Sequence, residues 1–177
     1  MEEPLLVKRV IYGYYGISGD IAQPALLKMV FVARRGKTRQ IVNESDMLQA
    51  INNTCGTLVR LEKHFFERKS FYWQLKLMRE TDIIIGVHGA AFVNIMFMMP
   101  FSGFIEFKSP AARLMYYTMM ARRTQLIYRE MWKAKVDFSG KLPRDKRNCN
   151  LIADIKEVVD SVREIAQNVK KEKYRIV

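Results

Sequence analysis

The sequence is poor in the residues that cross-link small proteins or hold metal ions. Its 177 residues include only two cysteines and two histidines, and neither Cys55 nor Cys149 lies in a CxxC or other metal-binding spacing. We therefore expect neither a disulfide scaffold nor a bound metal. Long apolar runs are also missing, because the most apolar stretch, residues 89–105, is interrupted by an asparagine, a proline and a glycine. That interruption predicts that this chain contains no membrane span.

The beginning of the chain lacks the features of a targeting segment. The first residues, Met1–Pro4, are acidic and no long apolar run follows them, so no cleavable signal peptide is visible. What the chain does have is an ordinary globular composition, with 49% hydrophobic and 27% charged residues. This length and composition predict one domain that is large enough to bury a core.

Positive charge is the strongest compositional bias. The formal net charge is +12, and residues 121–177 hold 15 of the 30 lysines and arginines against 8 of the 18 acidic residues. Such a surface is compatible with nucleic acid or anionic lipid, but a solvated helical face explains it more simply. Because the chain has no RRM, KH or helix-turn-helix pattern, we do not expect nucleic-acid binding.

Short apolar runs alternate with helical patterns along the chain, which is typical of βαβ units. The fold class that we expect is α/β, with a Rossmann-like parallel sheet and flanking helices. The polar stretch 133–150 is expected to be a surface loop. The expected strands are residues 29–33, 57–61, 82–87, 103–107 and 125–128, and the expected helices are residues 46–53, 67–79, 90–98, 111–122 and 151–173.

In this interpretation the chain divides after residue 27. Residues 28–177 form the Rossmann-like domain, which ends in an amphipathic helix with an apolar stripe from Ile155 to Val169. Residues 1–27 form a packing or linker segment, because residues 5–17 mix apolar and aromatic side chains without a clean period. We expect this segment to pack on a missing N-terminal domain or on a second copy of the chain.

Candidate site residues follow the expected strands. In open α/β sheets the ligand lies beyond the carboxyl ends of the strands. The turn that begins at His88 joins a buried strand to a helix, and Gly89 there allows the backbone to approach a ligand closely. Free N–H groups at Ala90 and Ala91 would favour an anion. A tight turn with a core-facing histidine explains the same residues equally well.

Two further strand ends carry charged residues. Arg34 and Arg39 lie in a basic run after the first strand, and guanidinium groups suit phosphate because they bind two oxygens at once. Taken alone, a solvated basic loop is the simpler explanation. Glu106 ends the fourth strand, where acidic residues of dinucleotide-binding folds accept hydrogen bonds from ribose hydroxyls.

Two linked runs resemble signatures of glycosyltransferase family 61. Residues 33–44, ARRGKTRQIVNE, resemble that family's SRR…R.I.NE segment, and residues 81–90, TDIIIGVHGA, resemble its TDI.IG.HGAGLTN signature. Glu106 falls where the family has its IE pair, and Gln74 also agrees. The order and spacing of the motifs match over roughly residues 28–130.

The resemblance implies an inverting transferase of GT-B architecture, of which this chain is similar only to the C-terminal, donor-binding half. The implied donor is a UDP-sugar, bound without a metal or another cofactor, and the implied acceptor is a hydroxyl of a protein or glycan. The sugar would be N-acetylglucosamine or a pentose. The family works in the lumen of the endoplasmic reticulum or Golgi. The general base would lie outside this chain.

The family motifs also imply a role for each candidate residue. The two arginines, Arg34 and Arg39, would neutralise the diphosphate. Backbone N–H groups from Gly89 to Ala91 would hold its oxygens. Glu106 would orient the ribose. The nucleotide-sugar site would comprise Arg34, Arg39, Asn43, His88, Gly89, Ala90, Ala91, Asn94 and Glu106, with Asn43 and His88 on the sugar side.

The chain departs from the family signature just after the His-Gly-Ala turn. Where the family has Gly-Leu-Thr-Asn, this sequence has Ala91-Phe92-Val93-Asn94. Ala91 restricts the backbone, and Val93 removes a hydroxyl that would reach a phosphate or cap the helix. Asn94 is retained. These departures leave a second hypothesis open, in which the chain is a non-catalytic nucleotide-binding relative or an interaction domain.

Overall fold

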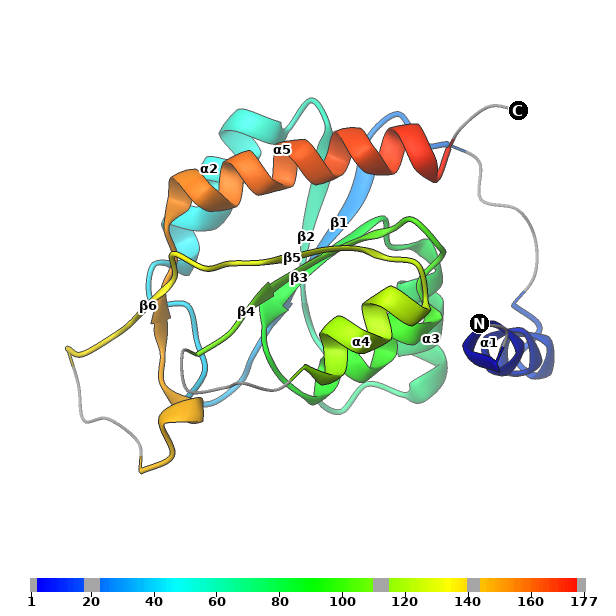
Figure 1. The fold of residues 1–177 in the computed structure, drawn as a ribbon, viewed down its shortest axis with the longest axis horizontal. Coiled ribbons are helices and arrows are strands. Elements are labelled where there is room, and N and C mark those ends of the chain that lie inside the picture. The colour runs from blue at the N-terminus through cyan, green and yellow to red at the C-terminus, as the bar shows by residue number, and fades with distance from the viewer. Residues whose placement is uncertain (1–2, 18–22, 110–114, 140–143, 175–177) are drawn as a thin grey trace.

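A computed structural model describes residues 3–17, 23–109, 115–139 and 144–174. Its centre is a five-stranded parallel sheet in the order β2-β1-β3-β4-β5 (Figure 1). This arrangement confirms the expected α/β, Rossmann-like fold. The strands are β1 Leu27–Ala33, β2 Val59–Phe65, β3 Ile83–Val87, β4 Gly103–Phe107 and β5 Ile127–Glu130.

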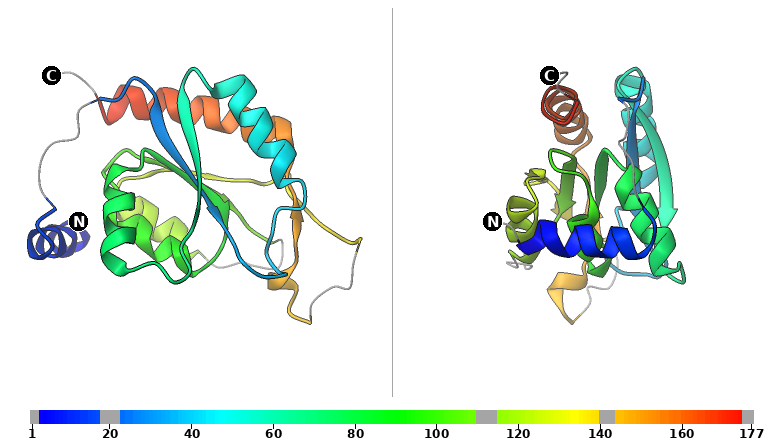
Figure 2. Two further views of the ribbon diagram at one scale, coloured as in Figure 1. Left: turned by 180° about the vertical axis from the view of Figure 1, so that it is seen from behind. Right: turned by 90° about the vertical axis from the view of Figure 1, so that its right-hand side faces the viewer.

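Helices cover both faces of the sheet, and Figures 1 and 2 show the three layers. One face is covered by α2 and α5, and the other by α3, the 3₁₀ helix η1 and α4. The bounds are α2 Glu44–Cys55, α3 Phe71–Glu80, η1 Ala90–Phe97, α4 Tyr116–Arg123 and α5 Ile155–Glu172.

The strand sequences explain why both faces need cover. In β3, Ile83 and Ile85 point into the core beneath α2 and α5, whereas Ile84 points into the core beneath α3 and η1. Side chains alternate between the two faces of a strand, so an uninterrupted apolar run has to be buried on both sides.

The strand order creates a switch point between β1 and β3. From β1 the chain moves outward to β2 and then returns across β1 to β3, so its connections leave in opposite directions. A crevice forms outside the carboxyl ends of two such strands, and ligands of open α/β sheets bind there. The residues that follow β1 and β3 are therefore the candidates for a ligand-binding site.

Several expected boundaries are wrong. The second strand spans residues 59–65 instead of 57–61, and α3 begins at residue 71 because Ser70 accepts a hydrogen bond from the Trp73 N–H at 3.2 Å. The short helix after β3 is a 3₁₀ helix. The helix expected at 111–122 begins at Tyr116 in the part described, and its residues 111–114 lie outside the described residues.

The expected loop 133–150 and the last helix also need correction. The described part of that loop contains β6, Lys135–Val136, and a 3₁₀ turn, η2 Lys146–Asn148. β6 pairs antiparallel with β7, Leu151–Ile152, so α5 starts at residue 155 instead of 151. Asp154 caps that helix by accepting a hydrogen bond from the Glu157 N–H at 2.8 Å.

The helix α1, Glu3–Tyr14, packs against η1. Its Lys8 is buried and donates to the Met98 carbonyl at 2.9 Å, and its Tyr12 hydroxyl donates to the Phe97 carbonyl. Burial, with help from nearby Arg79 and Lys173, lowers the pKa of Lys8 to about 8. The apolar residues of the same helix that remain exposed are Leu6, Val7, Val10 and Tyr14.

Part of residues 5–17 therefore packs within the chain, and part still presents an apolar face to solvent. None of the helices described is long and apolar enough to cross a membrane.

Candidate functional site

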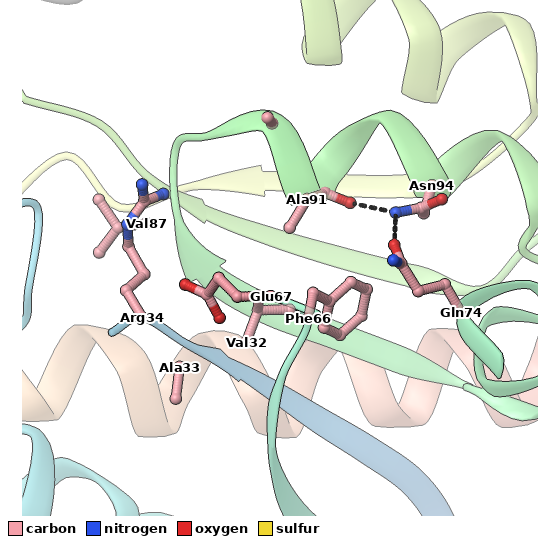
Figure 3. Close-up of a pocket in the computed structure, with 10 residues that line it drawn as sticks. Val32, Ala33, Arg34, Phe66, Glu67, Gln74, Val87, Ala91 and Asn94 are labelled. Atoms are coloured by element: carbon pink, nitrogen blue, oxygen red, sulfur yellow. Dashed lines mark hydrogen bonds between the residues drawn. The ribbon is translucent and has the colours of Figure 1, made fainter. Parts of the chain in front are cut away.

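A pocket of about 290 Å³ lies at the carboxyl ends of β1 and β3 (Figure 3). Its position coincides with the switch point of the sheet. Figure 3 shows Arg34 at one end of the pocket, the amide side chains of Gln74 and Asn94 at the other, and Glu67 between them. The lining residues are Val32, Ala33, Arg34, Phe66, Glu67, Gln74, Val87, Ala90, Ala91 and Asn94.

Arg34 and Gly89 pack directly against each other. A Cβ atom on Gly89 would lie 2.1 Å from Nη1 of Arg34, which is far inside contact distance. The backbone of Gly89 is extended, with a φ of 174°, so conformation alone does not require glycine. The absence of a side chain at residue 89 instead leaves room for the Arg34 guanidinium to lie over the turn.

Arg39 is not among the residues that line the pocket, but it adds a second positive charge near Arg34. Burial lowers the pKa of Arg34, and the positive charge of Arg39 lowers it further. The Nε atom of Arg39 is buried and has no hydrogen-bond partner among the described residues. Two nearby cations, one with an unused buried donor, form a group that an anionic ligand would stabilise.

The turn residue His88 is held by a buried carboxylate. Glu106 is fully buried, and its Oε1 lies 2.6 Å from Nδ1 of His88. Its Oε2 accepts a hydrogen bond from the Tyr128 hydroxyl at 2.8 Å and lies 3.4 Å from Nζ of Lys108. This pairing fixes the orientation of the imidazole, whose ring centroid is 4.9 Å from that of Tyr117. Direct contact between Glu106 and a ribose would require these partners to be displaced.

The far end of the pocket is neutral and polar. The Asn94 amide donates to Oε1 of Gln74 at 2.7 Å and to the Ala91 carbonyl at 3.1 Å. These bonds fix the orientation of both side chains and leave the Asn94 amide oxygen as an acceptor. Glu67 adds a carboxylate to the same pocket, and its Oε1 accepts a hydrogen bond from the Arg35 N–H at 3.1 Å.

The structure brings most, but not all, of the sequence-derived candidates together. The pocket is lined by Arg34, Ala90, Ala91 and Asn94, with Gly89 beneath Arg34. His88 and Glu106 lie in the adjoining buried network. Asn43 lies elsewhere: its amide donates to the Ala153 carbonyl at 3.0 Å and accepts from the Ala153 N–H at 2.8 Å. Those bonds tie the chain before α2 to the start of α5. The binding roles of all these residues remain predictions.

Glu67 is a pocket residue that the sequence reasoning missed, although the signal was present. It follows β2 just as Arg34 follows β1, and the rule that chemistry gathers at strand ends applies to both. The second strand was expected to end at residue 61, whereas β2 continues to Phe65. Once the strand is placed correctly, Glu67 falls at the carboxyl edge of the sheet.

Comparisons with known proteins agree on one family. A sequence model of the Glycosyltransferase 61 family matches residues 7–105 of this chain, a range that begins within α1. The chain is 32% identical over 72 residues to the EGF domain-specific O-linked N-acetylglucosamine transferase of Drosophila melanogaster, covering 41% of this chain and 14% of that protein. It is 25% identical over 130 residues to the protein of the same name from Rattus norvegicus, covering 73% of this chain and 24% of the relative. The chain thus spans a quarter or less of the length of these relatives.

Proposed function

Because the chain belongs to the glycosyltransferase 61 family, we propose that it forms the donor-binding half of an inverting, UDP-sugar-dependent transferase of GT-B architecture. The observation that supports this proposal most is the Arg34 guanidinium, which lies over Gly89 at the switch point of the sheet. An arginine in that position meets a diphosphate where α/β folds place their ligands.

The charges in the pocket favour a nucleotide sugar over a simple anion. Arg34 in the pocket and Arg39 near it attract phosphate, whereas the carboxylate of Glu67 repels it and accepts hydrogen bonds from hydroxyl groups. The Asn94 oxygen is a further acceptor for N–H or O–H groups. A ligand with phosphates for the arginines, hydroxyl groups for Glu67 and an amide N–H for Asn94 would match all of these side chains. The volume of about 290 Å³ is at the low end for ligand pockets, so part of such a donor would extend outside it.

Each residue then has a definite role in donor binding. Arg34 and Arg39 neutralise the diphosphate leaving group, which makes a divalent metal unnecessary. The N–H groups of Gly89 to Ala91 donate to phosphate oxygens. His88, oriented by Glu106, faces the sugar side. Glu106 acts through His88 because its own oxygens are already occupied. We propose N-acetylglucosamine or a pentose as the transferred sugar.

The acceptor half of the reaction belongs to parts beyond these residues. We propose that the acceptor is a hydroxyl of a protein, such as a folded EGF-like domain, or of a glycan, and that transfer takes place in the lumen of the secretory pathway. A second domain or a second copy would supply the general base and cover the exposed apolar face of α1.

A second candidate function is a non-catalytic relative that retains nucleotide binding. Ala91, which replaces the glycine of the family signature, lines the pocket directly. A methyl group there restricts both the backbone and the space for a phosphate. Transfer activity of the chain in the presence of a proposed acceptor-binding partner, compared with the affinity of the chain for nucleotide, separates this candidate from the first.

Calorimetric titration with UDP in the presence of EDTA tests the proposed donor site. The wild-type chain should bind UDP without metal. Arg34→Met, which keeps the apolar stem but removes the charged donors, should weaken binding by about 10- to 150-fold, the equivalent of about 1.5–3 kcal/mol for a charge-assisted hydrogen bond. Arg129→Met is the matched control, because Arg129 pairs with Glu164 on the surface. Equal affinity in all three proteins would remove Arg34 from the site.

A further inference from the structure

The loop after β1, which contains Arg34 and Arg39, is hydrogen-bonded to a segment more than 100 residues further along the chain. The Arg39 N–H donates to the Asn148 carbonyl at 3.3 Å, and the Val42 N–H donates to the Leu151 carbonyl at 2.8 Å. Ile41 and Leu151 form a parallel bridge. Residues 148–153, here called the strap, therefore run alongside residues 39–43 at the carboxyl edge of the sheet.

Gln40 and Asn150 are the centre of this contact. Oδ1 of Asn150 accepts the Gln40 N–H at 3.1 Å, and the Gln40 carbonyl accepts the Leu151 N–H at 2.8 Å. The Gln40 side chain donates to the Gly36 carbonyl at 2.6 Å, which closes the loop back toward β1. On its other side, the Asn150 carbonyl accepts the Asp137 N–H at 2.9 Å. One asparagine thus joins the arginine loop to the β6–β7 ribbon.

Arg39 needs such support for two reasons. Its φ is 55°, a left-handed conformation that a residue other than glycine keeps only when its surroundings enforce it. Its neighbour Gln40 also donates from its side chain to the Arg34 carbonyl at 3.5 Å, which keeps this part of the loop near Arg34. Two guanidinium groups repel each other in the absence of a ligand, and a free loop would let them separate.

We propose that Asn150 is a positioning residue for the anion site. Through the backbone of Gln40 it holds Arg39 beside Arg34, and this pairing makes the site select ligands with two adjacent phosphates over ligands with one. The inference rests on the proposed donor-binding function, which it deepens by assigning diphosphate selectivity to a residue outside the pocket.

The test compares the affinities of the purified chain for UDP and UMP by calorimetry. Asn150→Ala should weaken UDP binding by about five- to tenfold, the effect of one supporting hydrogen bond, and should change UMP binding by less than about twofold. In an Arg39→Ala background the Asn150→Ala change should have no further effect on UDP. Asn148→Ala is the matched control, because Asn148 contacts Arg39 through its main-chain carbonyl, which the substitution retains.

The outcomes separate the two proposals. If the wild type prefers UDP and Asn150→Ala behaves like Asn148→Ala, the positioning role is refuted and the donor site stands. An equal loss of UDP and UMP affinity also refutes it, since the effect is then a general loosening. If the wild type binds neither nucleotide, the proposed function fails first and this inference fails with it.

Discussion

The contact between Gly89 and Arg34 predicts that the substitution Gly89→Ala weakens UDP binding but leaves the stability of the fold almost unchanged. In Gly89→Ala the new Cβ would lie 2.1 Å from Nη1 of Arg34, whereas ordinary contact requires about 3.5 Å, so the guanidinium has to retreat by about 1.4 Å. That atom is the far end of a flexible side chain, and the extended backbone accepts alanine. The free energy of unfolding should therefore change by less than about 0.5 kcal/mol.

Donor binding should respond very differently. A shift of about 1.4 Å breaks a hydrogen bond of ordinary length, so Gly89→Ala should lose the Arg34 contribution of about 1.5–3 kcal/mol, or about 10- to 150-fold in UDP affinity. Because both changes remove the same contact, Arg34→Met should add little in the Gly89→Ala background. The assays are calorimetry with UDP and urea unfolding of the same samples.

Gly86→Ala is the control with the opposite pattern. A Cβ there would meet the Val32 carbonyl at 3.1 Å and the Phe92 ring at 3.2 Å inside the core, so we expect a loss of stability of about 1–3 kcal/mol. Unchanged UDP affinity in Gly89→Ala, with the fold intact, would refute the reasoning that this glycine makes room for Arg34.

Three further predictions concern the buried residues Glu106 and Lys8 and the transfer activity of the chain. Glu106→Gln should lower the free energy of unfolding by about 2–3 kcal/mol in urea titrations, because it removes the buried charged partner of His88 and Lys108. The control Glu164→Gln, on the surface, should lower it by less than about 0.5 kcal/mol. Equal losses in the two variants would contradict a stabilising role for the buried carboxylate. The difference in Tm between the wild type and Lys8→Met should shift in favour of the wild type as the pH rises from about 8 to 10.5. The pKa of Lys8 is lowered from 10.5 to about 8 in the folded state, so in this pH range the unfolded chain binds one more proton than the folded chain, and raising the pH stabilises the folded state. A difference in Tm that does not change with pH would show that Lys8 is exposed to water. Residues 1–177 alone should transfer no labelled sugar to the proposed acceptors. In the proposed GT-B arrangement, acceptor positioning worth roughly 7–11 kcal/mol and a base worth about 10²–10⁴-fold would come from a second domain or a second copy. Robust turnover would show that this chain completes the acceptor site.

Local patterns in the sequence were sufficient for the sheet but not for its boundaries. The apolar runs of β1, β3 and β4 predicted buried parallel strands, because burial on both faces leaves a continuous apolar signature. β2 is an edge strand with exposed Arg60 and Lys63, so its second half has no continuous apolar run. The sequence therefore predicts an end at residue 61 instead of residue 65, and Glu67 is not recognised as a residue that follows a strand.

Long-range contacts were beyond the reach of the sequence reasoning. The role of Asn43 depends on Ala153, 110 residues away, and no local period reveals that pairing. The same holds for Asn150 and Gln40. In α1, Lys8 is buried while Leu6 and Val10 remain exposed, which reverses what amphipathic patterning predicts. Strand-end chemistry, by contrast, is local, and it led directly to Arg34 and to the turn at Gly89.

Mapping the backbone amides by NMR during titration with a UDP-sugar, in the presence of EDTA, tests the central claim most directly. The account predicts saturable shifts of the amide signals of Gly89, Ala90 and Ala91, together with those of the loop around Arg34 and Arg39. Arg34→Met should abolish these shifts at the same ligand concentration. Shifts confined to the basic region of residues 121–177, with the turn at Gly89 unaffected, would contradict the claim that this chain holds a donor site between β1 and β3.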